Sequence, residues 1–253
     1  MTDPKISRRA AVVAAITGNI LSACASASAP MLSFEDDFSG PEGSPPDPAK
    51  WLHDIGNTGY GYGQMQTYTT SRANSFLDGK GHLVIRATRD GNGYASARLT
   101  TSGRFTQYRG TFEARIKLEV QRGVWPAFWL LGLGRWPSHG EVDIMENYGQ
   151  DFGESSVHTP EGTDSVFTAD GSVPVDNDWH VWRTVWDAHG FSFARDGVQY
   201  LTVKPSQLRN WPFSSGSPMC LIVNLAIGGA AGVPPASTRF PAEMLVDYVR
   251  VWK

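Results

Sequence analysis

The sequence predicts an all-β fold: a β-jelly-roll sandwich of two curved antiparallel sheets with a concave substrate cleft. Three observations support this prediction. The 253 residues include 27 glycines and 16 prolines, so turns are frequent. Short segments of alternating apolar and polar residues recur between these turns. No long stretch carries the apolar stripe of an amphipathic helix. Many short strands in one domain require a sandwich or a barrel, and we expect the sandwich.

Strands are expected along the whole domain. Segment 81–89 alternates and is bounded by glycine-containing turns. Segment 110–120 alternates apolar with charged residues, the pattern of a strand with one buried face. Segment 191–203 predicts a hairpin, because its centre reads Asp-Gly, a preferred turn. Segments 180–187 and 244–253 are rich in β-branched and aromatic residues and predict further strands.

Residues 1–30 are expected to be an export signal and linker, followed by one domain at 31–253. Arg8 and Arg9 precede a mildly apolar run and then small residues, which resembles a twin-arginine signal. Two processing reactions remain open. The sequence LSAC resembles a lipobox, which would make Cys24 the site of a lipid anchor, whereas the ASA that follows resembles an ordinary cleavage site. Either reaction places the domain outside the cytoplasm, secreted or at the cell surface.

Charge and cysteine content exclude two classes of function. The net charge is −3 with no long run of one sign, so no nucleic-acid partner is expected. The two cysteines, Cys24 and Cys220, are too few for a disulfide scaffold. Cys220 lies in an apolar segment and is expected to be a small buried side chain. We expect a monomer.

The sequence EVDIME at 141–146 places three acids on one predicted strand. Glu141 and Asp143 share a face because side chains alternate, but strict alternation would bury Glu146 in the core. An unpaired buried carboxylate is costly. We therefore predict a β-bulge at Ile144–Met145, whose extra residue returns Glu146 to the face of the other two acids.

Three acids on one face have three explanations. They form a solvated surface, or they bind calcium, although a flat strand surrounds an ion poorly. In the third explanation, two carboxyl groups cleave a glycosidic bond, and the third acid raises the pKa of the proton donor by its charge. Trp125, Trp129 and Trp136 favour this explanation, because sugar rings stack on indoles. Core packing equally explains Trp129.

The sequence GEVDIMENYG, preceded by GVWPAFWLLG, resembles the signature of the family 16 glycoside hydrolases. It is most similar to their bacterial laminarinase-type members, the endo-β-1,3-glucanases. The resemblance extends over most of the domain, through FEDDFSG, YRGTFEARIKL, NLAIGG and PAEMLVDYVRVWK. It implies a curved jelly roll with a cleft across the concave sheet. It also implies internal hydrolysis of a β-glucan polysaccharide by double displacement with retained configuration.

The resemblance implies a role for individual residues. Glu141 matches the nucleophile, Asp143 the assisting acid and Glu146 the acid/base, and His158 matches a histidine near the acid/base. No cofactor is expected for catalysis. Asp247 resembles the side-chain ligand of a structural calcium ion, although an ordinary strand acid explains it equally. The residues expected to bind the sugar are Trp125, Trp129, Trp136, His158, Asn57, Arg98 and Asn224; turn, surface or sheet-edge roles remain open for the last three.

One departure from the family pattern leaves the substrate open. Laminarinase-like members often carry N-x-E-x-Q-x-Y early in the cleft, and Gln64 stands in place of that glutamate. The alternatives are another polysaccharide, such as a mixed-linkage glucan, agarose or carrageenan, and a non-catalytic glucan-binding protein. Binding proteins of this fold typically lack the catalytic glutamates. The short segment between Glu146 and His158 predicts an open groove and internal cleavage.

Overall fold

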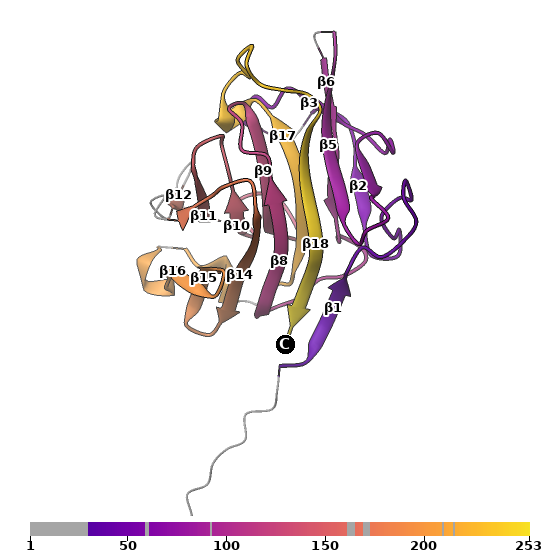
Figure 1. Cartoon of the computed structure of the whole chain (residues 1–253). Coiled ribbons are helices and arrows are strands. Elements are labelled where there is room, and N and C mark those ends of the chain that lie inside the picture. The colour runs from indigo at the N-terminus through magenta and orange to yellow at the C-terminus, as the bar shows by residue number, and fades with distance from the viewer. Residues whose placement is uncertain are drawn as a thin grey trace, which may run out of the picture.

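The computed structural model describes residues 30–58, 61–91, 93–160, 165–168, 173–208, 210–214 and 216–253. These residues form two stacked sheets, one in front of the other in Figure 1. The expected export signal, including Cys24, lies outside the described residues. No helix in the described part of the chain is long and apolar enough to cross a membrane.

The first sheet, called the outer sheet, contains ten strands. Their order is β16 (Val198–Val203), β15 (Gly190–Arg195), β14 (Trp179–Asp187), β8 (Gly110–Leu118), β18 (Ala242–Trp252), β5 (Leu83–Asp90), β6 (Gly93–Ser96) and β3 (Gln66–Tyr68), with β1 (Leu32–Asp36) beside β18 and β4 (Ser75–Leu77) beside β5. The pairing is antiparallel except between β3 and β6, which run parallel.

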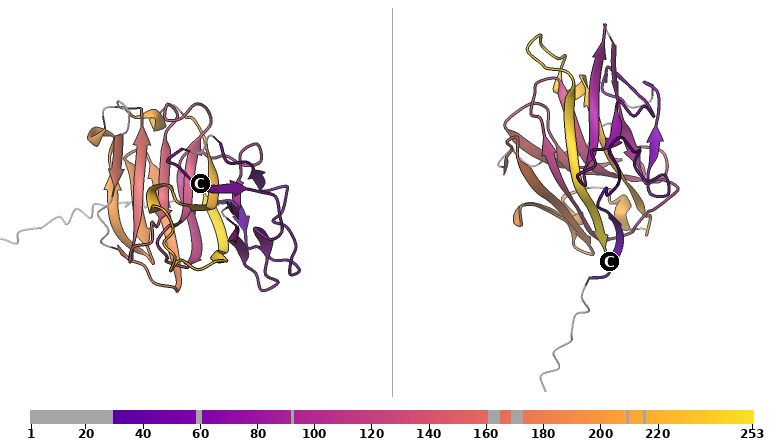
Figure 2. Two further views of the ribbon diagram at one scale, coloured as in Figure 1. Left: turned by 90° about the horizontal axis from the view of Figure 1, so that it is seen from above. Right: turned by 45° about the vertical axis from the view of Figure 1, so that its right-hand side comes forward.

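The second sheet, called the concave sheet, contains eight strands. Their order is β12 (Ser165–Thr168), β11 (Phe152–Thr159), β10 (Glu141–Glu146), β9 (Val124–Gly132), β17 (Met219–Ile227), β7 (Arg98–Thr100) and β2 (Leu52–Asp54), with β13 (Val173–Pro174) beside β11. The described residues also include three short 3-10 helices, η1 (Pro205–Gln207), η2 (Pro212–Ser214) and η3 (Gly229–Ala231). Figure 2 shows the curvature of the stacked sheets from two further directions.

The predicted all-β sandwich and its strands are confirmed. In β8 the apolar side chains Phe112, Ala114 and Ile116 are fully buried between the sheets, as their alternation indicates. The predicted hairpin is formed by β15 and β16, and its turn residues Asp196 and Gly197 both have positive φ, 51° and 79°.

Apolar residues gather on both faces of the concave sheet. The main core lies between the sheets. A smaller cluster of Ala127, Trp129, Cys220 and Ile222 covers the opposite face of β9 and β17. Cys220 is only 2% exposed, which confirms that it is a buried small side chain. The second cluster gives the concave face an apolar floor.

The core of β8 provides a stability prediction. Phe112→Ala is expected to lower the free energy of unfolding by about 3–5 kcal/mol, because the surrounding side chains cannot fill the space of a fully buried ring. Denaturant-induced unfolding measures the change. Lys117→Ala on the same strand is the control and should change stability by no more than about 0.5 kcal/mol. Equal stabilities for the two variants would contradict the assigned core.

Candidate active site

The predicted bulge on β10 is confirmed by the strand register. Asp143 lies opposite Trp129 of β9, while Met145 lies opposite the next residue, Phe128. Ile144 is therefore an extra residue in β10. The register with β11 shifts at the same place, between Asp143 and Glu146.

The bulge sorts the side chains of β10 between the two faces. Val142, Ile144 and Met145 are fully buried in the core between the sheets. Glu146 turns to the concave face with the other two acids. The carbonyl of Ile144 accepts a hydrogen bond of 2.7 Å from the hydroxyl of Ser155, so the bulge is held by the neighbouring strand.

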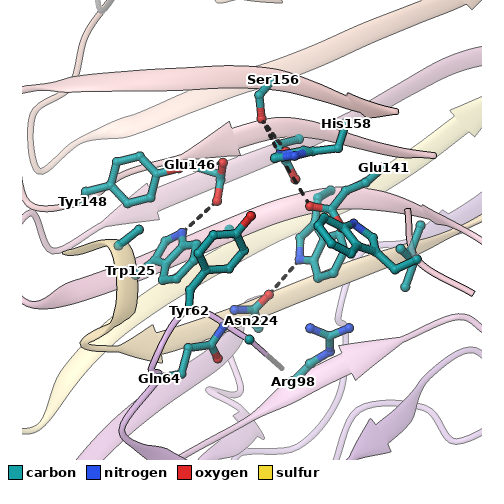
Figure 3. Close-up of a pocket in the computed structure, with 17 residues that line it drawn as sticks. Tyr62, Gln64, Arg98, Trp125, Glu141, Glu146, Tyr148, Ser156, His158 and Asn224 are labelled. Atoms are coloured by element: carbon teal, nitrogen blue, oxygen red, sulfur yellow. Dashed lines mark hydrogen bonds and ion pairs between the residues drawn. The ribbon is translucent and has the colours of Figure 1, made fainter. Parts of the chain in front are cut away.

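The three acids line a cavity of about 380 Å³ on the concave face, shown in Figure 3. Strands β7, β9, β10, β11 and β17 form its floor. Its lining residues are Gly61, Tyr62, Gln64, Arg98, Trp125, Ala127, Trp129, Leu131, Trp136, Glu141, Asp143, Glu146, Tyr148, Ser156, His158, Asn224 and Ala230.

Glu141 is surrounded by cations and an N–H donor. His158 lies directly opposite it on β11, with Nε2 3.7 Å from Oε1. The indole of Trp136 donates a hydrogen bond to it, and the charge of Arg98 also acts on it. Burial and the negative charge of Asp143 raise the pKa of Glu141 to about 8, although the two cations and the indole oppose the rise.

Asp143 and His158 form a close pair beside Glu141. Nε2 of His158 lies 3.0 Å from Oδ2 of Asp143, and the hydroxyl of Ser156 donates to the same oxygen. Burial alone would lower the pKa of His158, but the hydrogen bond and charge of Asp143 and the charge of Glu141 raise it to about 9. The imidazole is therefore a cation at neutral pH.

Glu146 is surrounded by neutral donors. Nε1 of Trp125 donates to its Oε1 at 2.8 Å, and the hydroxyl of Tyr148 donates to its Oε2 at 2.8 Å. The carboxyl group forms no ion pair among the described residues. Burial and the charge of Asp143 raise the pKa of Glu146 well above its usual range.

The structure places His158 in the same cavity as Glu146, on the strand beside β10. Its resemblance to a family histidine placed it near the acid/base. Its ion-pair contacts are with Asp143 and Glu141, nearer the start of β10. The reason is the register, because β11 pairs His158 with Glu141 and Ser156 with Asp143.

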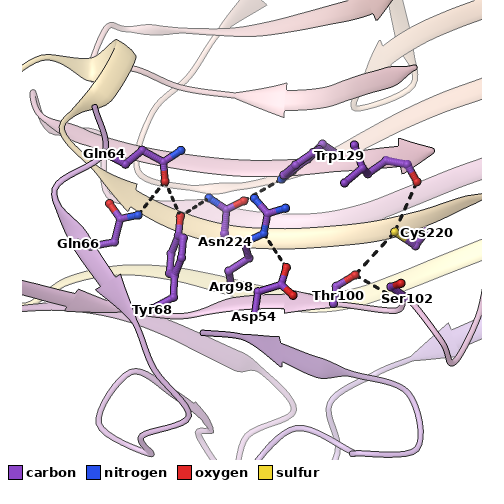
Figure 4. Close-up of polar contacts among 11 residues, drawn as sticks. Asp54, Gln64, Gln66, Tyr68, Arg98, Thr100, Ser102, Trp129, Cys220 and Asn224 are labelled. Atoms are coloured by element: carbon purple, nitrogen blue, oxygen red, sulfur yellow. Dashed lines mark hydrogen bonds and ion pairs between the residues drawn. The ribbon is translucent and has the colours of Figure 1, made fainter. Parts of the chain in front are cut away.

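Three of the remaining predicted residues, Trp129, Asn224 and Arg98, form one edge of the cavity floor, shown in Figure 4. The indole Nε1 of Trp129 donates to Oδ1 of Asn224 at 2.7 Å. The guanidinium of Arg98 lies 4.6 Å from the centre of the Trp129 ring and donates to Asp54 at 2.8 Å. Trp129 thus belongs to the cavity as well as to the apolar floor. Trp136 is 40% exposed at the cavity rim.

Two predicted residues lie away from the cavity. Asn57 is exposed on the bend after β2 and does not line the cavity. Asp247 belongs to β18 of the outer sheet, where it accepts a hydrogen bond of 2.7 Å from Nη1 of Arg115. This ion pair uses one of the two carboxylate oxygens of Asp247. The structural calcium stays a prediction.

One group in the described residues has the spacing of a metal site. The ligand atoms of Glu141, Asp143 and His158 lie within 4.8 Å of one another. A metal requires the neutral imidazole, whereas the two carboxylates hold His158 as a cation. Their geometry therefore fits a charged hydrogen-bonded cluster better than a metal centre.

Sequence reasoning missed three residues that bring a hydroxyl group to the cavity. Tyr148 lies two positions after Glu146 and Ser156 two positions before His158, so strand alternation could have identified both. Tyr62 comes from the loop before β3, where no periodic signal exists.

A concave sheet that carries two glutamates in unlike surroundings, beside several indole faces, fits a glycoside hydrolase. The sequence profile described as "Glycosyl hydrolases family 16" matches residues 63–250, so the chain belongs to this family. This confirms the resemblance found in the sequence.

Individual relatives agree with this result. The chain is 38% identical to a beta-glucanase of Rhodothermus marinus, over 87% of this chain and 84% of that protein. It is 31% identical to glucan endo-1,3-beta-glucosidase A1 of Niallia circulans, over 88% of this chain but 38% of that longer protein. The structure of the laminarinase from Rhodothermus marinus matches with a TM-score of 0.77 and 34% identity, covering 89% of this chain and 98% of that one.

The pair formed by Asp143 and His158 provides a titration prediction. The imidazole of His158 should lose its proton with a midpoint near pH 9, measured by NMR. Asp143→Asn should lower this midpoint by at least about one unit, because burial then acts without the opposing charge. Asp176→Asn, which removes a carboxylate bonded to a different histidine, His180, is the control. An unchanged midpoint in Asp143→Asn would contradict the pairing.

Proposed function

We propose that this chain is a retaining, endo-acting hydrolase of β-1,3-glucan linkages, with Glu141 as the nucleophile and Glu146 as the acid/base. The observation that carries the proposal is the difference in charge around the two glutamates. Cations surround Glu141, whereas neutral donors and a neighbouring carboxylate surround Glu146. Burial and Asp143 raise the pKa of both glutamates, but cations oppose this rise at Glu141 alone. The reaction requires two carboxyl groups in such unlike surroundings.

The charges around the two glutamates indicate which of them carries the proton before the reaction. Although burial and Asp143 raise the pKa of Glu141, the positive charges of His158 and Arg98 stabilise its carboxylate, and we therefore assign the attack to Glu141. Glu146 is buried beside Asp143 with no cation paired to it in the described structure, so it retains the proton. Asp143 acts on both glutamates. It orients His158 beside Glu141, and its charge repels a negative charge on Glu146.

The reaction then proceeds in two displacements. Glu146 protonates the glycosidic oxygen while Glu141 attacks the anomeric carbon, which forms a covalent glycosyl-enzyme and releases the first product. Glu146, now ionised, takes a proton from water, and the water oxygen displaces Glu141 from the anomeric carbon. Two inversions restore the β configuration.

The shape of the cleft supports internal cleavage. A second cavity of about 220 Å³ shares Arg98 and Leu131 with the first and extends along β7 and the segment after β9. A groove that continues past the acids accommodates a chain on both sides of the cleaved bond. The names of the relatives support β-1,3-glucan as the polymer.

The substrate proposal is tested with a panel of polysaccharides. Laminarin should release a series of oligosaccharides, and proton NMR should show the β anomer first, because configuration is retained. Lichenan, agarose and carrageenan are tested in parallel. Products from a galactan alone would replace the proposed polymer, and tight binding to laminarin without products would indicate a non-catalytic binding protein.

The catalytic roles are tested by Glu141→Ala and Glu146→Ala. Each should lower kcat on laminarin by about 10³-fold or more, since each removes a group that changes its bonds in the reaction. Azide should restore turnover in both and separate the roles: α-glycosyl azide from Glu141→Ala and β-glycosyl azide from Glu146→Ala. Glu243→Ala, which breaks a surface ion pair with Arg86, is the control. Near-normal activity in either active-site variant would refute the assignment.

A further inference from the structure

We propose that Tyr148 is a positioning residue for Glu146: its hydroxyl group fixes the second carboxyl oxygen and stays bonded to it in both protonation states. This inference rests on the acid/base role proposed above for Glu146. Nothing in the acid motif itself assigned a role to Tyr148.

The geometry holds Glu146 at both oxygens. Tyr148 donates to Oε2 at 2.8 Å, and Trp125 donates to Oε1 at 2.8 Å. The centres of the two aromatic rings lie 5.4 Å apart. Glu146 is only 7% exposed, so both hydrogen bonds are largely shielded from water. Figure 3 shows the neighbouring rings of Tyr148 and Trp125, both next to the carboxyl group of Glu146.

The indole of Trp125 and the hydroxyl of Tyr148 differ in the hydrogen bonds that they can form. An indole N–H only donates, whereas a phenol hydroxyl donates or accepts. When Glu146 has given up its proton, Tyr148 donates to the carboxylate and stabilises it. When Glu146 is protonated, the same hydroxyl can turn and accept. Tyr148 keeps its own proton throughout, because burial and the charge of Glu146 raise the pKa of Tyr148 far above its usual range.

The turn after β10 places Tyr148 over Glu146. Nδ2 of Asn147 donates to the carbonyl oxygens of Gln150 and Phe152, both at 2.8 Å, and its Oδ1 accepts from the amide of Gly149 at 2.9 Å. The amide of Tyr148 donates to the side chain of Gln150 at 2.8 Å. Gly149 has a φ of 87°, which a residue with a side chain rarely adopts. The orientation of Tyr148 is therefore fixed by its own loop.

The test is Tyr148→Phe, which keeps the ring against Trp125 and removes the hydroxyl. The alkaline limit of the kcat/KM profile reports the loss of the proton from Glu146. Removing a hydrogen bond to the carboxylate raises the pKa of Glu146, so this limit should move up by about one pH unit. We expect kcat to fall about tenfold and KM to change less than about twofold, because the acid/base is misplaced while the sugar contacts remain.

The matched control is Tyr248→Phe. The hydroxyl of Tyr248 donates to Oε1 of the buried Glu113 at 2.9 Å, the same pair of groups in the outer sheet. This variant should leave the pH profile unchanged. If Tyr148→Phe also leaves it unchanged, or only raises KM, Tyr148 contacts the sugar or the core and the inference is wrong.

Two further measurements separate the role of Tyr148 from the proposed function and from a folding defect. Titration of ¹³C-labelled glutamate, with Glu146 assigned by Glu146→Gln, should show the same upward shift in Tyr148→Phe without any substrate. An enzyme that releases no sugar would thus refute the proposed function, whereas an unchanged Glu146 midpoint would refute the role of Tyr148. Should Tyr148→Phe fail to fold, 3,5-difluorotyrosine at position 148 is a stronger donor and should move the midpoint downward; no movement would overturn the inference.

Discussion

The site depends on one backbone constraint, the extra residue at Ile144 in β10. Without it, the alternation that buries Val142 would also bury Glu146 in the apolar core between the sheets. Burying a carboxyl group there is costly. With it, two consecutive apolar residues enter the core and both glutamates face one cavity. The bulge therefore lets one short strand serve the core and the cleft at once. Its carbonyl is held by Ser155, so the irregularity is part of the hydrogen-bonded sheet.

Glu141 and Glu146 have identical side chains, so any difference in their chemistry comes from the residues that surround them. The register of β11 puts His158 opposite Glu141, and β7 brings Arg98 to the same region. At the other end of the strand, Trp125 and Tyr148 offer hydrogen bonds without charge. These unlike neighbours are the basis of the proposal that Glu141 attacks and Glu146 carries the proton.

Much of this arrangement was predictable because it is periodic. Alternation in β8 identified the core residues, and the cost of burying Glu146 identified the bulge. Residues whose position depends on loops or on cross-strand register were placed less well. Asn57 lies on an exposed bend away from the cavity, and the contacts of His158 follow from pairing between β10 and β11, which the sequence of one strand does not specify. Asp247 pairs with Arg115 of a strand far away in the sequence.

The same arrangement explains how the fold tolerates a costly site. Asp143 and Glu146 are nearly buried on one face, and the charge of Asp143 raises the cost of ionising Glu146. Hydrogen-bonding partners offset part of the cost of burying each acid. Asp143 contacts the cation of His158 and the hydroxyl of Ser156. Glu146 accepts hydrogen bonds from the hydroxyl of Tyr148 and the indole of Trp125. Every partner comes from β9, β11 or the turn after β10, next to the acids. The polar cluster is therefore stabilised within its own sheet, and the side chains that β10 places in the core behind it are Val142, Ile144 and Met145, all apolar.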